Sequence, residues 1–397
     1  FNMYVPTGFV FGNGRLSELS QYKMPGKKAM IVTTNGTSVF KNRAYDNTVE
    51  QLNKAGVASV LFNEVQANPL KSTVMPNPLK QTIMEGAAFA KENHCDFIVA
   101  LGGGSVMDAA KAMAFMATNP GDLWDYIVGG SGKGQPMQEK PLPIVCITTT
   151  AGTGSEADQW GVISHDERNE KIGFGGWDEL FPVLSIIDPE LMRTVPPKFT
   201  AYQGFDALFH ATECYISKGA NMMSDMYALT AIENIATYLA RAVKDGNDME
   251  AREHVAFANT LSGIVMTICS TTAEHSIEHA MSAFHHELPH GAGLIMISKA
   301  FYEFFIEHHA CDERFIRMAQ VMGIPNANKP EDFITALVNL QKACGVEHLK
   351  MSEYGFTPDE FEAIAANAKE TMGGLFLANP CELPHEGCVE ILRKSYR

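Results

Sequence analysis

The chain alternates short β-rich runs with helical segments as far as Pro197, and only helical segments follow beyond that point. The β-rich runs are KAMIVTT (28–34), VASVLF (57–62), DFIVALGGGS (96–105), PIVCITTT (143–150) and LSIIDP (184–189). Amphipathic segments such as Leu79–Asn93 separate these runs. Such alternation is typical of βα units around a mostly parallel sheet. The sequence therefore predicts an α/β fold for its first half.

The second half has the periodicity of helices in segments such as 199–217, 224–243 and 251–269. Its start is marked by Pro196 and Pro197, which can continue neither a helix nor a β-ladder. At 397 residues the chain is also longer than one typical domain. We therefore expect an α/β domain over residues 1–195 and an all-helical domain over residues 196–397.

A glycine-rich turn stands between a buried strand and a helix in DFIVALGGGSVMDAAKAMAFMA. Free N–H groups and the helix dipole at such a turn attract anions such as phosphate. The dinucleotide-binding fingerprint would place a third glycine where this chain has Met107. The turn alone therefore fits either a phosphate site or a tight connection without a ligand.

A second stretch, TTTAGTGSE (148–156), also follows a buried strand and offers hydroxyl groups and two glycines. Ligands of open α/β sheets bind at the carboxyl ends of the strands. Two such loops in one domain favour a phosphate-bearing cofactor, and ordinary Thr/Ser turn chemistry is the alternative.

Histidines are concentrated in HSIEHAMSAFHHELPHG, which holds five of the thirteen within the sixteen residues from 275 to 290. His275 and His279 are four residues apart, as are Asp206 and His210, so each pair lies on one face of a helix. His290 opens a further predicted helix and can complete the set. Histidines with one carboxylate suit Fe(II) or Zn(II) better than Ca²⁺ or Mg²⁺. The alternative is a group of hydrogen-bonded core histidines.

Two features of this stretch remain open. His285 and His286 have the character of polar surface residues, although spacing alone does not exclude His286 as a ligand. HSIEH also satisfies the H-x-x-E-H pattern of inverted zinc peptidases, in which Glu278 would act as general base. That hypothesis leaves the two glycine-containing loops and the Asp206/His210 pair without a role.

Composition excludes several classes of partner. A net charge of −15 and a pI near 5.3 are opposite to the positive charge that binding to nucleic acid or anionic membranes requires. No run of about 18 apolar residues is present to span a membrane. The eight cysteines form no CxxC pair, and the first residues lack a signal-peptide pattern, so we expect a cytoplasmic protein with reduced thiols.

Taken together, the motifs resemble those of the iron-containing (group III) alcohol dehydrogenases over nearly the whole chain. The motifs that carry this resemblance are PTGFVFGNGRLSEL, GGGSVMDAAK, TTAGTGSE, IIDPELMRTVPP, DALFHATECYIS and HSIEHAMSAFHHELPHG. The resemblance implies an N-terminal dinucleotide-binding domain and an all-helical metal-binding domain, the architecture shared with dehydroquinate synthases.

The resemblance also assigns site residues. The implied metal ligands are Asp206, His210, His275 and His290, and His279 is the implied proton-relaying residue near the nicotinamide. The implied cofactor-binding residues are Asn77, Gly103, Gly104, Ser105, Thr149, Thr150 and Lys171. Asn77 is preferred to Asn68 because it keeps the family's distance to Gly102.

Cofactor preference depends on the residues after KAMIVTT. NAD-preferring members of the family tend to place an Asp there, whereas this chain has Thr34, Asn35 and Gly36. Without a carboxylate to repel it, a 2′-phosphate is tolerated. We therefore include Thr34 among the cofactor-binding residues and favour NADP(H) over NAD(H).

The resemblance implies a metal-dependent, NAD(P)(H)-linked alcohol dehydrogenase or aldehyde reductase for small substrates. Fe²⁺ is the expected metal, with Zn²⁺ also possible, and hydride transfer is expected in the cleft between the domains. The resemblance further suggests a homodimer. A polyol dehydrogenase of the glycerol type is the nearest alternative; a zinc peptidase and a metal-binding protein without catalytic activity are more distant ones.

Overall fold

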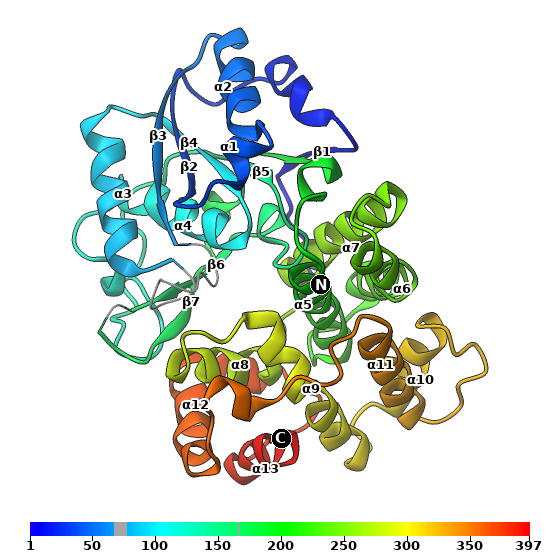
Figure 1. Ribbon diagram of the computed structural model, residues 1–397. Helices are drawn as coiled ribbons and strands as arrows, with labels where there is room; N and C mark the ends of the chain where they lie inside the picture. Colours follow the sequence, from blue (N-terminus) through cyan, green and yellow to red (C-terminus); the bar gives the residue numbers. More distant parts are fainter. Residues whose placement is uncertain (67–77, 166) are drawn as a thin grey trace. The chain divides into compact units, whose positions relative to one another are not determined.

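The chain folds into two compact units in a computed structural model that describes residues 1–66, 78–165 and 167–397 (Figure 1). One unit is Val5–Thr194, and the other joins Val195–Arg397 with Phe1–Tyr4. The predicted cofactor residue Asn77, and Asn68 with it, lie outside the described residues.

The first unit contains a six-stranded sheet in which every neighbouring pair is parallel. Its strands are β1 (Gly8–Phe11), β2 (Lys28–Thr34), β3 (Ala58–Val65), β4 (Phe97–Gly102), β5 (Ile144–Thr148) and β8 (Leu184–Ile187), in the order β1-β8-β5-β4-β2-β3. A separate antiparallel hairpin pairs β6 (Trp160–Ser164) with β7 (Lys171–Gly175). The α-helices are α1 (Ser38–Lys41), α2 (Ala44–Lys54), α3 (Lys80–Glu92) and α4 (Gly104–Met116). The 3₁₀ helices are η1 (Arg15–Gln21), η2 (Leu123–Asp125), η3 (Ser155–Ala157), η4 (Asp178–Leu180) and η5 (Pro189–Met192).

Strand β2 shows why these sequences form a doubly covered sheet. Met30 and Val32 belong to one buried cluster, with residues of α3 and α4, and Ala29 and Ile31 belong to another. Alternate side chains of a strand point to opposite faces, so a strand that is apolar at every position is buried on both faces. The predicted α/β fold with a mostly parallel sheet is confirmed.

The strand order creates a topological switch point. The chain passes from β2 outward to β3 and then returns to form β4 on the other side of β2. Ligands of open α/β sheets bind where the order reverses, at the carboxyl ends of the strands. In this sheet that place is next to Thr34, at the end of β2, and Gly102, at the end of β4.

The sequence pattern predicted β2, β3, β4, β5 and β8, but it did not predict β1 or the hairpin. Strand β1 has only four residues, and only one of them, Val10, is buried. The hairpin strands are short and contain glycines, including Gly173 and Gly175. Glycine weakens the strand signal in a sequence, so both elements depend on contacts made by the folded chain.

The second unit is helical, as predicted. Its α-helices are α5 (Pro197–Ile216), α6 (Met222–Lys244), α7 (Met249–Ile268), α8 (Ala273–Phe284), α9 (His290–Glu307), α10 (Asp312–Val321), α11 (Glu331–Ala343), α12 (Phe361–Leu377) and α13 (His385–Ser395), with 3₁₀ helices η6 (Met351–Tyr354) and η7 (Pro358–Glu360). Pro197, which marks the end of the alternating pattern, is the first residue of α5. Proline fits that position because a helix leaves its first N–H groups unbonded.

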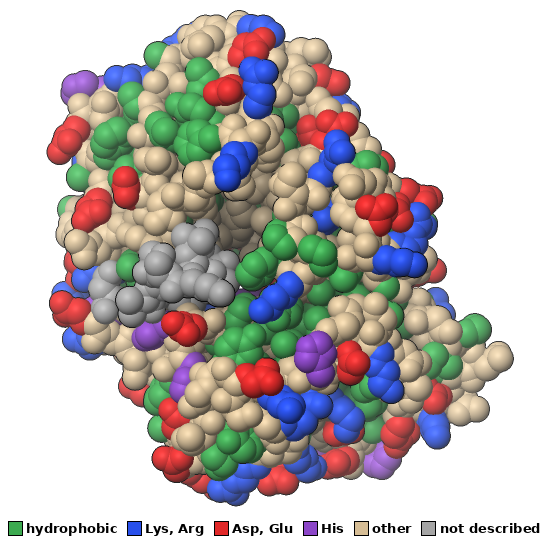
Figure 2. All heavy atoms as spheres, in the orientation of Figure 1, with side chains coloured by type: hydrophobic (Ala, Val, Ile, Leu, Met, Phe, Trp, Pro, Cys, Tyr) green, Lys and Arg blue, Asp and Glu red, His purple; other side chains and the backbone are tan. Residues whose placement is uncertain are grey.

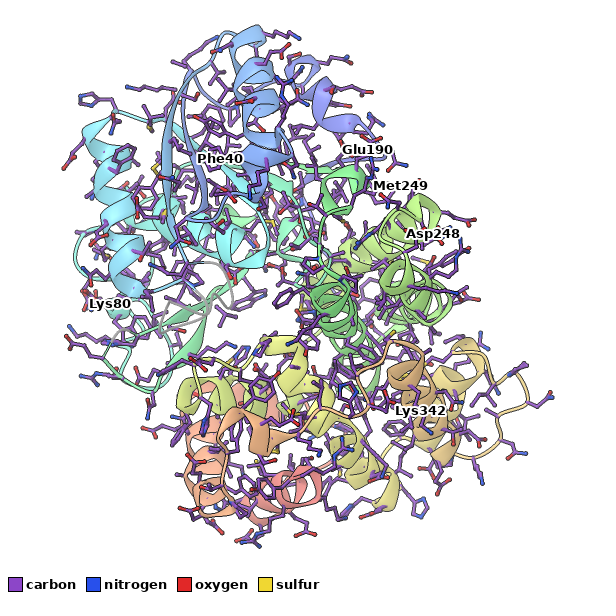
Figure 3. The ribbon with its side chains drawn as sticks, viewed as in Figure 1. Phe40, Lys80, Glu190, Asp248, Met249 and Lys342 are labelled. Atoms are coloured by element: carbon purple, nitrogen blue, oxygen red, sulfur yellow. The ribbon has the colours of Figure 1, made fainter. Side chains whose placement is uncertain are left out.

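Local signals fix the helix ends. Asp248 precedes α7 and accepts a hydrogen bond from the Ala251 N–H at 3.1 Å, and Figure 3 labels it beside Met249, the first residue of that helix. Lys342, also labelled, lies in the last turn of α11, where a cation complements the helix dipole. These ends therefore follow from sequence-local chemistry.

The charge distribution of the surface and the hydropathy of the helices both concern possible partners. Acidic and basic side chains are interspersed over the face that Figure 2 displays. Within the described residues, no single helix is long and apolar enough to cross a membrane. The pair α7 and α8 meets the requirement by length and composition when taken together, but the chain bends by 106° between them.

Candidate metal centre and cofactor-binding loops

Three helices bring the four predicted metal ligands together. Asp206 and His210 lie one turn apart on α5, His275 lies on α8, and His290 is the first residue of α9. The Nε2 atoms of all three histidines approach the same oxygen, Oδ1 of Asp206. Their distances to it are 3.5 Å for His210, 3.2 Å for His275 and 3.3 Å for His290.

Two buried glutamates hold the opposite side of two of these rings. Glu213 contacts Nδ1 of His275, and Glu278 contacts Nδ1 of His290. If both imidazoles are neutral and each carboxylate accepts the Nδ1–H, Nε2 is left as an acceptor facing Asp206. Lone pairs of nitrogen and oxygen that face one another repel unless a cation lies between them. A carboxylate that orients a metal-binding histidine is a common second layer of a metal site.

The electrostatic environment of the cluster around Asp206 favours a positive charge. Burial opposes ionisation of Asp206, but His210 and His290 outweigh it and hold the pKa of that carboxyl well below its usual range. Burial likewise opposes charging of His275, but Glu213 and Asp206 outweigh it and raise the pKa of that imidazole well above its usual value. The cluster is therefore arranged to hold a positive charge, either a proton or a metal cation.

His279 lies beside this cluster. Its ring centre is 5.3 Å from that of His290 and 6.1 Å from that of His275. Ligand atoms of Glu278, His279 and His290 also lie within 4.8 Å of one another. Thus the structure brings the predicted relay residue next to the predicted ligands.

The other histidines of the stretch have different surroundings. His285 contacts the carboxylate of Glu360 at 3.0 Å through Nε2, and its ring packs on Phe356. Burial lowers the pKa of His286. Glu278, the general base of the peptidase hypothesis, is fully buried between Ser282 and His290. In this position its carboxylate contacts Nδ1 of His290 and so orients that imidazole.

The two glycine-containing loops meet at the ends of β4 and β5. These strands are paired in register with Gly102 opposite Thr148, and the Thr149 N–H donates to the Gly102 carbonyl at 2.9 Å. Val106 and Met107 donate their N–H groups to the Gly103 carbonyl at 3.1 Å. The N–H groups of Gly104 and Ser105 are therefore the ones that helix α4 itself leaves without an acceptor.

Close packing explains two of the glycines. A Cβ atom at Gly103 would lie 2.7 Å from Oγ1 of Thr150, and one at Gly104 would lie 2.3 Å from Cγ2 of Thr153. No side chain fits at either position without moving a threonine. The two loops are thus packed directly against each other at the start of helix α4, where free N–H groups favour an anion such as a pyrophosphate.

Thr34 and Lys171 are placed less centrally. Thr34 ends β2, and its hydroxyl accepts the Gly36 N–H at 3.2 Å, which forms a local turn at the switch point. Lys171 begins β7 and is buried. Its hairpin is tied to α4 by a hydrogen bond from the Val162 N–H to Asp108 at 2.9 Å. Lys171 therefore belongs to the hairpin and is not part of the glycine-rich turn.

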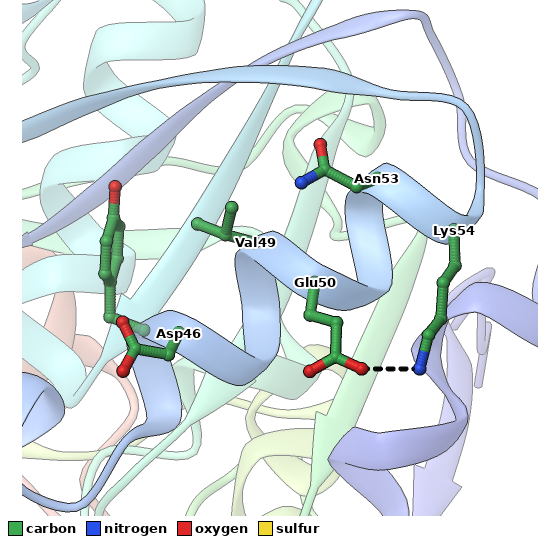
Figure 4. A pocket seen from close by; sticks show the side chains of 6 residues that line it. Asp46, Val49, Glu50, Asn53 and Lys54 are labelled. Carbon is green, nitrogen blue, oxygen red and sulfur yellow. Dashed lines mark ion pairs between the residues drawn. The ribbon is translucent and has the colours of Figure 1, made fainter.

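A shallow hollow elsewhere on this unit is unrelated to these loops. Figure 4 shows that its side chains all come from α2; they are Tyr45, Asp46, Val49, Glu50, Asn53 and Lys54. Glu50 and Lys54 form an ion pair of 2.6 Å across one turn of the helix. The hollow contains none of the predicted site residues, and we do not place the active site there.

Comparisons with known proteins agree with these observations. Sequence profiles described as "Iron-containing alcohol dehydrogenase" and "Fe-containing alcohol dehydrogenase family, C-terminal" match residues 6–189 and 200–396. A choline dehydrogenase of Bacillus subtilis is 35% identical over 370 residues, which cover 92% of this chain and 88% of that protein. A 1,3-propanediol dehydrogenase of Klebsiella pneumoniae is 32% identical, with 100% and 99% coverage. An archaeal alcohol dehydrogenase from a Red Sea brine pool has a solved structure with a TM-score of 0.91, 33% identity and coverage of 100% and 98%.

The chain belongs to the iron-containing alcohol dehydrogenase family. The resemblance noted from the sequence is confirmed, and so is the class of function, an NAD-type alcohol dehydrogenase with a metal cofactor. In an iron-containing alcohol dehydrogenase, the donor set of one carboxylate and three imidazoles fits a first-row divalent metal. The three Nε2 atoms that converge on Asp206 Oδ1 are the structural observation that agrees with such an ion.

Several residues of this iron-containing alcohol dehydrogenase were not identified from its sequence. Glu213 lies three residues after His210 in HATE, and Glu278 was considered only as a peptidase base. Lys111 is fully buried and donates to Ser155, to Asp158 and to the Trp160 carbonyl. Each of these charged residues lies within an apolar stretch of the sequence. A buried charge needs a partner, so this position was the one indication that the sequence offered.

Proposed function

We propose that this protein is an Fe²⁺-dependent, NAD(P)(H)-linked alcohol dehydrogenase or aldehyde reductase that acts on small, uncharged substrates. In this proposal the metal is held by Asp206, His210, His275 and His290. The observation that carries it is the convergence of three Nε2 atoms on one carboxylate oxygen, with carboxylates behind two of the rings. Zn²⁺ fits the same donors.

When bound, the metal supplies Lewis acidity toward the substrate oxygen, and the nicotinamide supplies the hydride chemistry. The protein contributes orientation and proton transfer. Glu213 and Glu278 hold the imidazoles of His275 and His290 in the ligand tautomer. We assign to His279, one helical turn from His275, the transfer of the alcohol proton toward solvent.

The cofactor is proposed to bind the first unit at the ends of β2, β4 and β5. Gly103, Gly104 and Ser105 receive the pyrophosphate, with Thr149 and Thr150 beside them. Lys171 and Asn77 complete the proposed set. NADP(H) is favoured over NAD(H) because Thr34 and its two following residues present no carboxylate to a 2′-phosphate.

A polyol substrate is the second candidate. The relative named a 1,3-propanediol dehydrogenase matches this chain over its whole length, which supports a diol or hydroxyaldehyde as substrate. We further propose a homodimer in the cytoplasm, where the eight unpaired cysteines stay reduced. The proposed division of labour assigns the cofactor to residues 1–195 and the metal to residues 196–397.

Anaerobic turnover tests these proposals. Metal-free protein is reconstituted with Fe(II) or Zn(II) and mixed with NADPH or NADH and a panel of short aldehydes and hydroxyaldehydes, and the absorbance at 340 nm is followed. The proposal expects oxidation that requires metal and is faster with NADPH. A faster rate with NADH would refute the assignment of Thr34, and a rate independent of metal would refute the ligand set.

A further inference from the structure

Helix α9 begins at the metal cluster and carries two glycines in its first turn. Its first four residues are His290, Gly291, Ala292 and Gly293, and both glycines are buried. Alanine is favoured over glycine within helices. Helix formation therefore does not explain either glycine, and the explanation lies in the neighbours of each one.

Gly291 lies against the backbone of α5. A Cβ atom at this position would lie 2.6 Å from the carbonyl carbon and 2.9 Å from the Cα atom of Tyr202. Tyr202 is one helical turn before Asp206, and in an α-helix its carbonyl accepts the Asp206 N–H. Helix backbone cannot rotate away as a side chain can. A side chain at residue 291 would therefore push the start of α9 away from Asp206.

Gly293 lies against the carboxylate that orients His290. A Cβ atom at this position would lie 2.8 Å from Cγ and 2.9 Å from Oε1 of Glu278. The other oxygen of that carboxylate contacts Nδ1 of His290. Because a glutamate side chain can rotate, an added methyl group would displace the carboxylate and leave the helix in place.

We propose that Gly291 and Gly293 are positioning residues of the metal site, which let α9 start close enough to α5 and α8 for His290 to complete the ligand set. This inference rests on the proposed role of His290 as a ligand. Nε2 of His290 lies 3.3 Å from Oδ1 of Asp206. Tetrahedral bonds of about 2.0–2.1 Å to zinc place two ligand atoms about 3.3–3.4 Å apart. The observed separation thus already suits one shared ion, and a shift of α9 would spoil it.

The affinity of metal-free protein for Zn(II), measured by competition with a chromogenic chelator, tests the proposal. Gly291→Ala is expected to weaken binding at least about 100-fold because the ligand itself moves, and Gly293→Ala about 10- to 100-fold, as for loss of an orienting carboxylate. Gly374→Ala is the control, since a Cβ atom there meets nothing within 4 Å, and should bind as the wild type does. Wild-type affinity in either folded variant would overturn the proposal. If Gly291→Ala does not fold, the result for Gly293→Ala decides.

Spectra of Co(II)-loaded protein separate positioning from a general loss of stability. The visible absorption bands of Co(II) report the number and arrangement of its ligands. At saturating Co(II) we expect altered bands in Gly291→Ala and wild-type bands in Gly86→Ala, whose Cβ atom would lie 2.5 Å from Sδ of Met113 in the other unit. Wild-type bands in Gly291→Ala would overturn the positioning role.

A variant of the ligand separates this inference from the proposed function. Wild-type Zn(II) affinity of His290→Ala would refute the ligand set, and the inference with it. Weak binding by His290→Ala together with wild-type binding by the two glycine variants would refute the positioning role alone.

Discussion

Replacement of Glu213 by glutamine tests whether the buried carboxylates set the metal affinity. Glu213 Oε1 accepts the N–H and hydroxyl of Thr272 at 3.0 and 2.7 Å, and Oε2 contacts Nδ1 of His275. Glutamine keeps the first oxygen for Thr272 but presents an NH₂ group to His275. Two donors then face each other, and the imidazole relieves the conflict by moving its proton to Nε2. That change removes one of the proposed ligands.

The size of the effect follows from the role of the residue. Removing a carboxylate that orients a metal-binding histidine lowers metal affinity about 10- to 100-fold. This corresponds to about 1.4–2.7 kcal/mol of binding free energy. The loss is smaller than that expected for deletion of His275, because the ring remains and a fraction of it can still bind.

Competition with a chromogenic chelator measures the affinity of metal-free protein for Zn(II). Glu353→Gln, at an exposed position, is the matched control and should leave the affinity unchanged. Circular dichroism and nucleotide binding report whether the variant is folded. If Glu213→Gln does not fold, Glu278→Gln applies the same reasoning to His290. Wild-type affinity in a folded Glu213→Gln protein would refute the orientation argument.

The remaining predictions concern both units. His275→Ala should abolish metal-dependent turnover while nucleotide binding, measured by fluorescence titration, is retained. Gly104→Val should weaken nucleotide binding in the same titration, since its Cβ would lie 2.3 Å from Thr153. Lys111→Met should lower the free energy of unfolding by about 3–5 kcal/mol, measured by denaturant titration, because it leaves buried carboxylates without their cation. Burial raises the pKa of Asp108 from 3.8 to about 6, so its contribution to stability is present below about pH 4 and lost as the pH rises through 6. Asp108→Asn should accordingly lose less thermal stability than the wild type between pH 4 and pH 6.

The parts of this fold that were predictable are those with a local cause. Strand β2 was predicted with its observed limits, because seven residues of β-favouring character are covered on both faces. The convergence of Asp206, His275 and His290 was foreseen from i,i+4 spacing and the resemblance, although their role as ligands stays a prediction. Strand β1 was missed because four residues with weak alternation carry too little signal.

The site residues that were missed share a different cause. The partner of Glu213 is His275, on another helix, and the distance between them in the chain is 62 residues. Nothing in the spacing of either residue indicates that pair. The break in α12, where Met372 has non-helical φ and ψ, has a similar cause, since Ser276 of α8 donates its hydroxyl to the Ala368 carbonyl of α12. Sequence periodicity predicts single helices and strands, whereas these contacts depend on which helices pack against each other in the folded chain.

The i,i+4 spacing of His275 and His279 describes only one face of helix α8, and the other faces also carry polar side chains. His275 and His279 share a face, but Ser276 binds α12, and Glu278 orients His290 at the start of α9. A helix that is buried on all sides uses each of its faces, and every polar side chain on it must find a partner. The glutamate that suggested a peptidase is explained by this requirement. Its carboxylate is fully buried and contacts Nδ1 of His290, so the imidazole is the partner that a charged group in this apolar helix requires.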